Sequence, residues 1–327
     1  MSVSPMVWLI TCAAILGLFV FDFFAHVRRP HAPTFGESAF WSAVYIGVAI
    51  SFGFAVIWMW GGAYGGEYYA GYITEKALSV DNLFVFAVIM SSFAVPPEYQ
   101  QKVLLAGILI ALVMRGLFIA VGAAAINAYS WVFYLFGVFL VYTAYKLIRE
   151  TGHEKEAEEK RESRITATAK RFLAATDEFD GDKLTTRIDG KRLATPLLLA
   201  LVAVGFTDLL FALDSIPAIY GLTSEPYIVF TANAFALMGL RQLFFLIGGL
   251  LERLVYLSYG LSIILAFIGG KLVLLALHEN TLPFVNGGDP VSVPEVSTGL
   301  SLGVITGVLV VTAVVSLLKT GTRTGKT

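Results

Sequence analysis

Long apolar stretches, separated by short polar or charged segments, run through almost the whole chain. A helix needs about 20 mostly apolar residues to cross the hydrocarbon core of a bilayer. The pattern therefore predicts nine membrane-spanning helices, at 6–25, 39–60, 68–94, 102–125, 128–148, 194–219, 227–250, 253–277 and 298–318. The expected fold class is all-α, a polytopic membrane protein.

Composition agrees with this pattern. The 327 residues are 57% hydrophobic and only 14% charged, with a mean hydropathy of +0.76. So much apolar surface does not fit inside one soluble core, and the expected surrounding is a lipid bilayer. The net charge of −1 gives no reason to expect a nucleic-acid partner. The single Cys12 excludes an internal disulfide and a thiolate metal cage.

Basic residues mark alternate connections between the expected helices. If the N-terminus lies outside, the inner connections hold Arg28, Lys102, the basic run 149–192 and the C-terminal tail. The outer connections then contain no Lys or Arg, as the positive-inside rule requires. We expect an outside N-terminus and a cytoplasmic C-terminus. Arg28 follows the first apolar stretch rather than preceding it, so that stretch is expected to be a retained helix and not a cleaved signal.

The expected organisation has six parts. They are an N-terminal two-helix segment (1–67), a first three-helix repeat (68–148), a charged cytoplasmic loop (149–193), a second three-helix repeat (194–277), an extracytoplasmic loop (278–297), and the last helix with a cytoplasmic tail (298–327). Within the charged loop, Glu150 to Arg164 is expected to be a solvated helix extension or a disordered linker. Near its end, Asp189-Gly190 predicts a tight hairpin turn.

Two acidic motifs indicate an internal repeat. The first is Thr74-Glu75-x5-Asp81-Asn82, and 133 positions later comes Thr207-Asp208-x5-Asp214-Ser215. Arg115 and Arg241 match at an offset of 126. Helices 3–5 would then correspond to helices 6–8, and because each unit has an odd number of spans, the two units would be inverted, as in many secondary transporters. Chance similarity between apolar helices is the alternative.

The acids of these motifs need neutralisation. Each charge near the membrane centre costs ~2.5–3.5 kcal/mol, so four bare carboxylates would cost roughly 10–14 kcal/mol. The carboxylates and their neutral neighbours offer only oxygen, which suits Mn²⁺, Ca²⁺ or Mg²⁺ and argues against Zn²⁺ or Cu⁺. The candidate ligands are Glu75, Asp81, Asp208 and Asp214, with Asn82 and Ser215 as weaker candidates.

Structural ion pairing is the competing interpretation. Lys76, Arg115 and Arg241 are intramembrane cations that could neutralise the acids, and with Asp22 they are also candidates for coupling transport to protons. Five acids against three cations leave about two negative charges, which a divalent cation would balance. Two carboxylates six residues apart diverge by about 120° around one helix. A compact site therefore needs both repeats or a broken helix, and Pro217 predicts a local break.

No enzyme motif is found. The chain has no P-loop, no Gly-x-Ser-x-Gly elbow and no His-Glu-x-x-His sequence. We therefore expect neither enzymatic activity nor a resident cofactor. The four histidines show no mutual i, i+4 spacing, and none is assigned as a ligand.

The two acidic motifs resemble the signature stretches of the TerC family of bacterial integral membrane proteins, including its Alx-like members. The similar segments run from Gly71 to Asn82 and from Thr207 to Ile219, with further likeness at Ala194 to Leu197 and Asn233 to Arg241. For Alx-like members the resemblance implies Mn²⁺ export, and for some relatives metal supply to exported proteins. It implies a bacterial inner membrane and carries the metal role onto Glu75, Asp81, Asp208 and Asp214.

These observations lead to two hypotheses. The first is a secondary exporter of a divalent cation, Mn²⁺ by resemblance and Mn²⁺ or Ca²⁺ by ligand chemistry, with a midplane acidic site and proton antiport. The second is a membrane scaffold or assembly factor connected with secretion or stress resistance, for which the secretion machinery is the candidate partner. Oligomeric state, regulation and the roles of the loops are not predicted.

Overall fold

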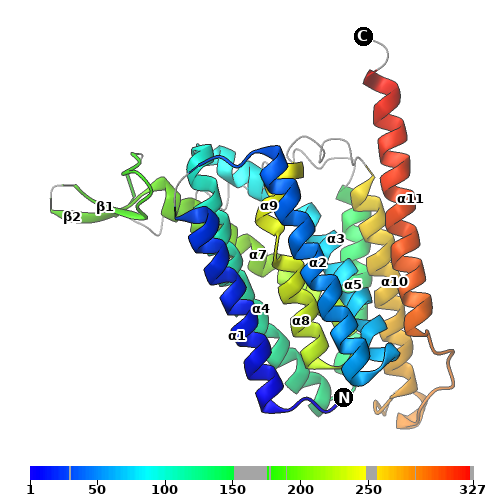
Figure 1. Ribbon diagram of the computed structural model, residues 1–327. Coiled ribbons are helices and arrows are strands. Elements are labelled where there is room, and N and C mark those ends of the chain that lie inside the picture. The colour runs from blue at the N-terminus through cyan, green and yellow to red at the C-terminus, as the bar shows by residue number, and fades with distance from the viewer. Residues whose placement is uncertain are drawn as a thin grey trace.

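The computed structural model describes residues 1–28, 31–150, 175–176, 178–188, 190–247, 256–283 and 285–324, with only the backbone described for Asp81, Glu150, Ile247 and residues 320–324. The expected linker from Glu150 to Arg164 falls almost entirely outside these ranges. Within them the chain is a bundle of long helices with one small hairpin at its end (Figure 1).

The helices confirm the expected membrane fold. They are α1 (Pro5–Asp22) with its π-helical continuation η1 (Phe23–Val27), α2 (Phe35–Trp60), α3 (Gly62–Ser92), α4 (Pro97–Ala128), α5 (Val132–Glu150), α7 (Pro196–Tyr220), α8 (Pro226–Leu237), α9 (Leu240–Ile247), α10 (Leu257–His278) and α11 (Thr298–Thr324). Among the described residues, eight spans are long and apolar enough to cross a membrane. The chain is a multi-pass integral membrane protein.

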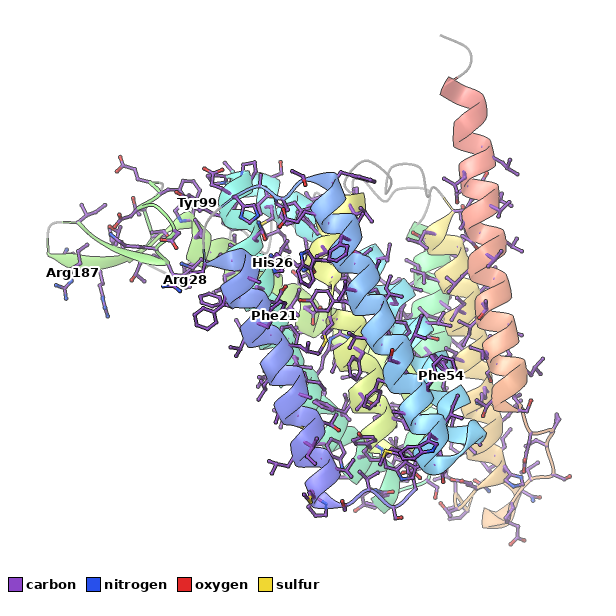
Figure 2. All side chains as sticks on the ribbon, in the orientation of Figure 1. Phe21, His26, Arg28, Phe54, Tyr99 and Arg187 are labelled. Atoms are coloured by element: carbon purple, nitrogen blue, oxygen red, sulfur yellow. The ribbon has the colours of Figure 1, made fainter. Side chains whose placement is uncertain are left out.

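Helix α3 completes the bundle although its charges lower its hydropathy. It packs against α2, α7, α8 and α11, so its acidic face is covered by protein instead of lipid. Large apolar side chains such as Phe54 on α2 and Val113 on α4 are exposed on the outside of the bundle, as expected for a lipid-facing surface. Figure 2 shows Phe54 there, with Arg28 and Tyr99 at one end of the bundle and Arg187 on the hairpin.

Local sequence explains several helix ends. Ser4 and Thr34 cap α1 and α2, each accepting from the amide three residues later, and Pro5 occupies the first turn of α1. Gly61, with φ of +98°, joins α2 directly to α3. A positive φ of this kind is readily available only to glycine.

One predicted helix is broken and another is not. The span expected at 227–250 consists of α8 and α9, separated by Met238 and Gly239, and Gly239 has a φ of +73°. The break expected near Pro217 is wrong, because α7 continues through Pro217 to Tyr220. Pro217 lies in the last turn of α7, with three helical residues after it. It lacks the N–H that would donate to the preceding turn, but so near the end of the helix the loss of this one hydrogen bond does not break α7.

The hairpin prediction is confirmed. Strand β1 (Thr185–Ile188) pairs antiparallel with β2 (Lys191–Ala194), and Ile188 faces Lys191 across the turn. Lys102 at the start of α4 anchors the loop before β1 by donating to Oδ2 of Asp182 at 2.8 Å. This contact lowers the pKa of Asp182 below its ordinary value.

Helix packing is compatible with an inverted repeat. Helix α4 packs against α7 while α3 packs against α8, and α5 packs against α10. A two-fold axis that exchanges α3–α5 with α7–α10 would interchange the first two contacts and preserve the third. Gly137 and Gly269 make the α5–α10 contact close, because a Cβ at Gly269 would lie 2.9 Å from the carbonyl oxygen of Gly137. The repeat itself stays a prediction.

The N-terminus and the C-terminal end of α11 lie at opposite ends of the bundle (Figure 1). Counting α3 with the eight apolar spans of the described residues gives nine crossings, which agrees with this arrangement. The hairpin projects from the end at which the C-terminal helix emerges. Which end faces the cytoplasm stays an expectation from the distribution of basic residues.

Candidate functional site

The guanidinium of Arg115 lies at the centre of the first buried polar cluster. Arg115 belongs to α4 and is completely buried. Its Nε donates to Oδ2 of Asp208 at 3.0 Å and its Nη2 to Oδ1 of the same carboxylate at 3.2 Å. This two-pronged pairing is the strongest geometry available to an arginine and a carboxylate. It joins α4 to α7 inside the bundle.

The remaining nitrogen of Arg115 reaches three more helical positions. Nη1 donates to Oε1 of Glu75 on α3, to Oγ of Ser215 on α7 at 2.9 Å, and to Oδ1 of Asn233 on α8 at 2.8 Å. Glu75 and Asp208, one from each acidic motif, therefore meet at a single cation. This Arg115 cluster has two carboxylates and one guanidinium, which leaves one negative formal charge among these three residues.

Several polar atoms of the Arg115 cluster, or of residues next to it in sequence, are buried without a hydrogen-bond partner. They include Oε2 of Glu75 and the hydroxyls of Thr74 and Thr207, which precede the two carboxylates in sequence. Nδ2 of Asn233 is also buried without a hydrogen-bond partner. Buried oxygens that lack a donor cost free energy unless something else satisfies them. They can act as hard ligands to a cation.

The other predicted ligands lie elsewhere. Asp214, one and two-thirds turns after Asp208 on α7, accepts from the hydroxyl of Thr143 on α5 at 3.1 Å. Its divergence from Asp208 is what a six-residue spacing on a continuous helix requires. Asn82 is buried on α3. Asp81 lies on the same helix, but its side chain is outside the described part of the structure. The structure thus brings together Glu75, Asp208 and Ser215 of the predicted set.

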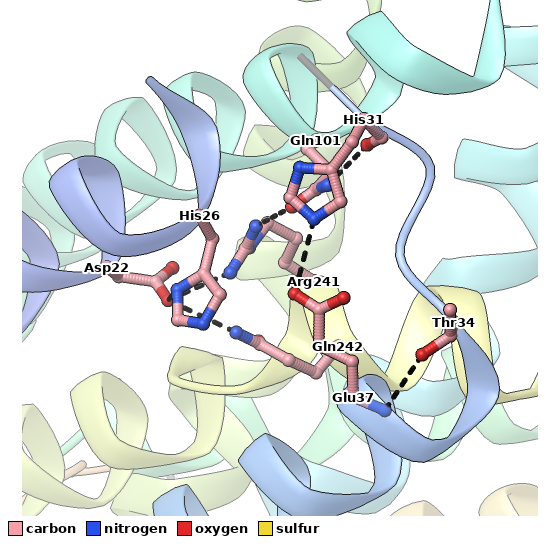
Figure 3. A network of polar contacts seen from close by, with 8 residues as sticks. All are labelled: Asp22, His26, His31, Thr34, Glu37, Gln101, Arg241 and Gln242. Carbon is pink, nitrogen blue, oxygen red and sulfur yellow. Dashed lines mark hydrogen bonds and ion pairs between the residues drawn. The ribbon is translucent and has the colours of Figure 1, made fainter. Parts of the chain in front are cut away.

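A second cluster surrounds Asp22 at the end of α1. Oδ1 of Asp22 accepts from the hydroxyl of Tyr45 at 2.7 Å, from Nη2 of Arg241 at 2.8 Å and from Nε2 of Gln242 at 3.2 Å. Nδ1 of His26 lies 3.2 Å from the same oxygen. Figure 3 shows Asp22 and His26 from α1 and η1 facing Arg241 and Gln242 from α9. Asp22 and Arg241 balance each other in charge, so this Asp22 cluster fits the structural interpretation of ion pairing.

A small cavity of about 10 Å³ adjoins the Asp22 cluster, between His26, Ser38, Gln101, Arg241 and Gln242. Oγ of Ser38, Nε of Arg241 and Oε1 of Gln242 are buried there without a hydrogen-bond partner. A cavity of this size is at the lower limit for one water molecule, which would need two to four polar partners. The site is polar and suited to water.

Sequence reasoning missed most of the Asp22 cluster. The histidines have no i, i+4 spacing among themselves, whereas His26 is four residues after Asp22 and buried beside it. That i, i+4 spacing was the available signal. Gln101 accepts from Nη1 of Arg241 and donates to the carbonyl of His31 at 2.6 Å. No spacing rule pairs a glutamine with partners on two separate segments of the chain.

Lys76 has an unexpected partner. Its ammonium donates to the carbonyl oxygens of Ala236 at 2.9 Å and Met238 at 3.1 Å, both at the end of α8. The hydrogen bonds of Lys76 therefore go to backbone carbonyls. They do not include the direct pairing with a carboxylate that the sequence led us to expect. The predicted repeat does not extend to the ion pairs, because Arg115 pairs with Glu75 and Asp208 whereas Arg241 pairs with Asp22.

In the described part of the chain, no three His, Cys, Asp or Glu side chains are grouped closely enough to hold a metal ion by themselves. The Arg115 cluster supplies two carboxylates. Any metal bound there would take its remaining ligands from hydroxyl, amide or water oxygens. Such mixed oxygen sets are ordinary for Mn²⁺, Ca²⁺ and Mg²⁺.

Comparison with known families gives a match over residues 60–324, to the family described as "Integral membrane protein TerC family". The chain is 54% identical over 317 residues to the uncharacterized membrane protein Rv2723 of Mycobacterium tuberculosis (strain H37Rv), covering 97% of this chain and 80% of the relative. It is 40% identical over 316 residues to a Myxococcus xanthus membrane protein, STKORF319, covering 97% and 93%.

More distant relatives carry a functional name. The chain is 34% identical over 322 residues to Alx of Escherichia coli (strain K12), with 96% of this chain and 94% of the relative covered, and the name of that relative describes a membrane-bound redox modulator. No solved structure matches the chain.

Proposed function

We propose, from the premise that this chain belongs to the TerC family of integral membrane proteins, that it is a secondary transporter that exports a divalent metal cation, with Mn²⁺ as its cargo. The preference for Mn²⁺ rests on the family resemblance. The ligand chemistry of the Arg115 cluster accommodates Mn²⁺ and Ca²⁺ equally.

The observation that carries the proposal is the charge imbalance of the Arg115 cluster. Glu75 and Asp208 are both buried, at 0% and 2% exposure, and they share one arginine. A structural lock between helices would need only one carboxylate for Arg115. A second buried carboxylate costs free energy, of order 2.5–3.5 kcal/mol at the centre of a membrane. The excess charge is useful if a cation binds there.

Transport requires that Arg115 and the metal ion share the carboxylates. Asp208 holds Arg115 by two hydrogen bonds, whereas Glu75 holds it through one oxygen and has a second oxygen free. In this scheme Arg115 stays with Asp208 while Glu75, with the hydroxyls of Thr74 and Thr207, offers oxygens to the cation. Asp214, which accepts from Thr143 on α5, serves as a further carboxylate for the cation.

Export needs an energy source. Moving a divalent cation outward against a negative-inside potential costs about 4.6 kcal/mol per 100 mV, at about 2.3 kcal/mol for each charge. Protonation of a carboxylate removes its charge and so weakens its hold on the metal. Proton uptake by the acids of the cluster would therefore couple metal release to the proton gradient without additional machinery.

A flux measurement tests this proposal. Purified protein is reconstituted in vesicles, and Mn²⁺ movement is followed with and without an imposed proton gradient. We expect gradient-dependent flux that D208N and E75Q abolish, because each removes one of the two carboxylates. D289N is the matched control, since Asp289 is exposed and lies in the loop after α10.

The contradictory result is flux that does not depend on the gradient and is unchanged in D208N and E75Q. Both variants must first show a folded, monodisperse protein. A variant that is folded but inactive supports a cargo site, whereas one that merely unfolds indicates a structural ion pair.

The second candidate, a scaffold or assembly factor, draws on the balanced Asp22 cluster and on the hairpin that projects from the bundle. A scaffold should keep its partners in D208N and E75Q. The name of Alx refers to a redox role. In this chain such a role could not use an exchange between two thiols of the same chain, because Cys12 is the one cysteine among the 327 residues.

A further inference from the structure

The break between α8 and α9 exposes backbone carbonyls in the interior of the bundle. Helix α8 ends at Leu237, Met238 has extended dihedral angles, and Gly239 turns the chain at a φ of +73°. Ala236, Leu237 and Met238 are 0–3% exposed, so these carbonyls are remote from bulk water. The last carbonyls of a helix have no partner within the helix and carry the negative end of its dipole.

These carbonyls are met by a cation from another helix. The Lys76 ammonium, on α3, contacts the carbonyl oxygens of Ala236 and Met238 at 2.9 and 3.1 Å. Lys76 and Ala236 are 160 positions apart in sequence, so Lys76 caps a helix other than its own. It places the side-chain nitrogen of Lys76, which donates both hydrogen bonds, at the negative end of α8.

In membrane transporters with discontinuous helices, unwound carbonyls and the C-terminal ends of half-helices bind small cations such as Na⁺. The α8–α9 break has the same parts: a half-helix C-terminus, an extended residue and a glycine. The difference is that the cation is covalently attached to α3. An ammonium group is close in size to K⁺ and is likewise accommodated by carbonyl oxygens.

We propose that the α8–α9 break is a binding site for a monovalent cation, and that the Lys76 ammonium is its permanent, tethered occupant. The site lies next to the Arg115 cluster in sequence, because Glu75 precedes Lys76, but it uses backbone oxygens on α8 in place of carboxylates. With Lys76 in place, the protein needs no monovalent cation from solution. Without the lysine, K⁺ or NH₄⁺ should bind at the carbonyls.

The test compares salts in a variant that lacks the tethered charge. K76A removes the ammonium and leaves room for an ion, and its thermal unfolding is measured in KCl, NH₄Cl and choline chloride at equal ionic strength. Choline is too large for the site. We expect K76A to unfold at a midpoint at least about 2 °C higher in KCl and NH₄Cl than in choline chloride, and the wild-type protein to show no such difference.

Two control variants sharpen the test. K76M fills the space of the lysine stem without charge and should not respond to K⁺ or NH₄⁺. K191A removes an exposed lysine from the hairpin and should behave as the wild-type protein does. A lysine that served only as a hydrogen-bond donor would not be replaced by K⁺, which donates no hydrogen bond.

The proposal is overturned if K76A shows no difference between KCl and choline chloride, or if K191A and the wild-type protein show the same difference. If K76A is not recovered folded in choline chloride, recovery in KCl or NH₄Cl supports the site, and failure in all three salts overturns it. Because the readout is stability, a negative result leaves the transport proposal untouched.

Discussion

At the scale of single residues, Arg115 donates hydrogen bonds to more side chains than the single partner of an ordinary ion pair. Its nitrogens reach Asp208, Glu75, Ser215 and Asn233, on three different helices. The sequence identified Arg115 and the two acids as charged residues in apolar helices. It did not show which acid pairs with which cation, because that depends on how α3, α4 and α7 are rotated against one another.

Removing the arginine should be strongly destabilising. R115M leaves Glu75 and Asp208 buried without their cation, and breaking a buried pair in this way costs about 3–5 kcal/mol. We expect a correspondingly lower unfolding midpoint in detergent. The triple variant R115M/E75Q/D208N should recover part of the loss, because no uncompensated charge remains.

The control for this prediction is R187M, which removes an exposed arginine of the hairpin. If R115M were as stable as R187M, the Arg115 cluster would not be a buried charge network that joins α3, α4 and α7. If the triple variant were no better than R115M, lost packing around the arginine stem would explain the loss.

At the scale of elements, hydropathy predicted the long helices because each must match the thickness of the hydrocarbon core, and eight of the described helical spans meet that requirement by length and hydropathy. The hairpin was predicted from its Asp-Gly turn. The break in the span from 226 to 247 was not predicted, because Gly239 lies among apolar residues in a segment long enough to span as one helix. The break depends on a tertiary contact, in which a lysine on α3 satisfies the freed carbonyls. A local sequence pattern does not show such a contact.

The glycine at this break should be hard to replace. In G239A an L-residue would adopt a φ of +73°, and its Cβ would lie 3.1 Å from Cβ of Tyr45. The backbone conformation alone costs roughly 1–2 kcal/mol. We expect G239A to lower the unfolding midpoint by that amount of free energy or more. G303A on α11, where an added Cβ contacts nothing within 4 Å, should be neutral or slightly stabilising, and equal effects of the two would contradict the assigned geometry.

At the scale of the whole molecule, the two acidic motifs meet in the interior but are not used alike. Glu75 and Asp208 converge on Arg115, whereas Asp214 turns toward α5 and Arg241 toward Asp22 on α1. Sequence similarity between the repeats could align these residues but could not reveal that their partners differ. The partners of Arg241 come from α1 and α4, and α1 lies outside the predicted repeats.

The unequal use of the charged residues gives the molecule two buried centres of different character. The Asp22 cluster is balanced in charge and joins α1, α2 and α9, so its role is to stabilise the bundle. The Arg115 cluster carries an excess carboxylate and unsatisfied oxygens between α3, α4, α7 and α8. Because of this excess, we propose that the Arg115 cluster, rather than the Asp22 cluster, binds the cargo.

Equilibrium binding of Mn²⁺ to the purified protein, measured by titration calorimetry, tests this division of roles most directly. We expect the wild-type protein and D289N to bind Mn²⁺ alike, and E75Q and D208N to bind it more than about tenfold more weakly while remaining folded. Wild-type protein that binds no divalent cation, or folded E75Q and D208N variants that bind Mn²⁺ with unchanged affinity, would contradict the claim that these carboxylates hold the transported ion.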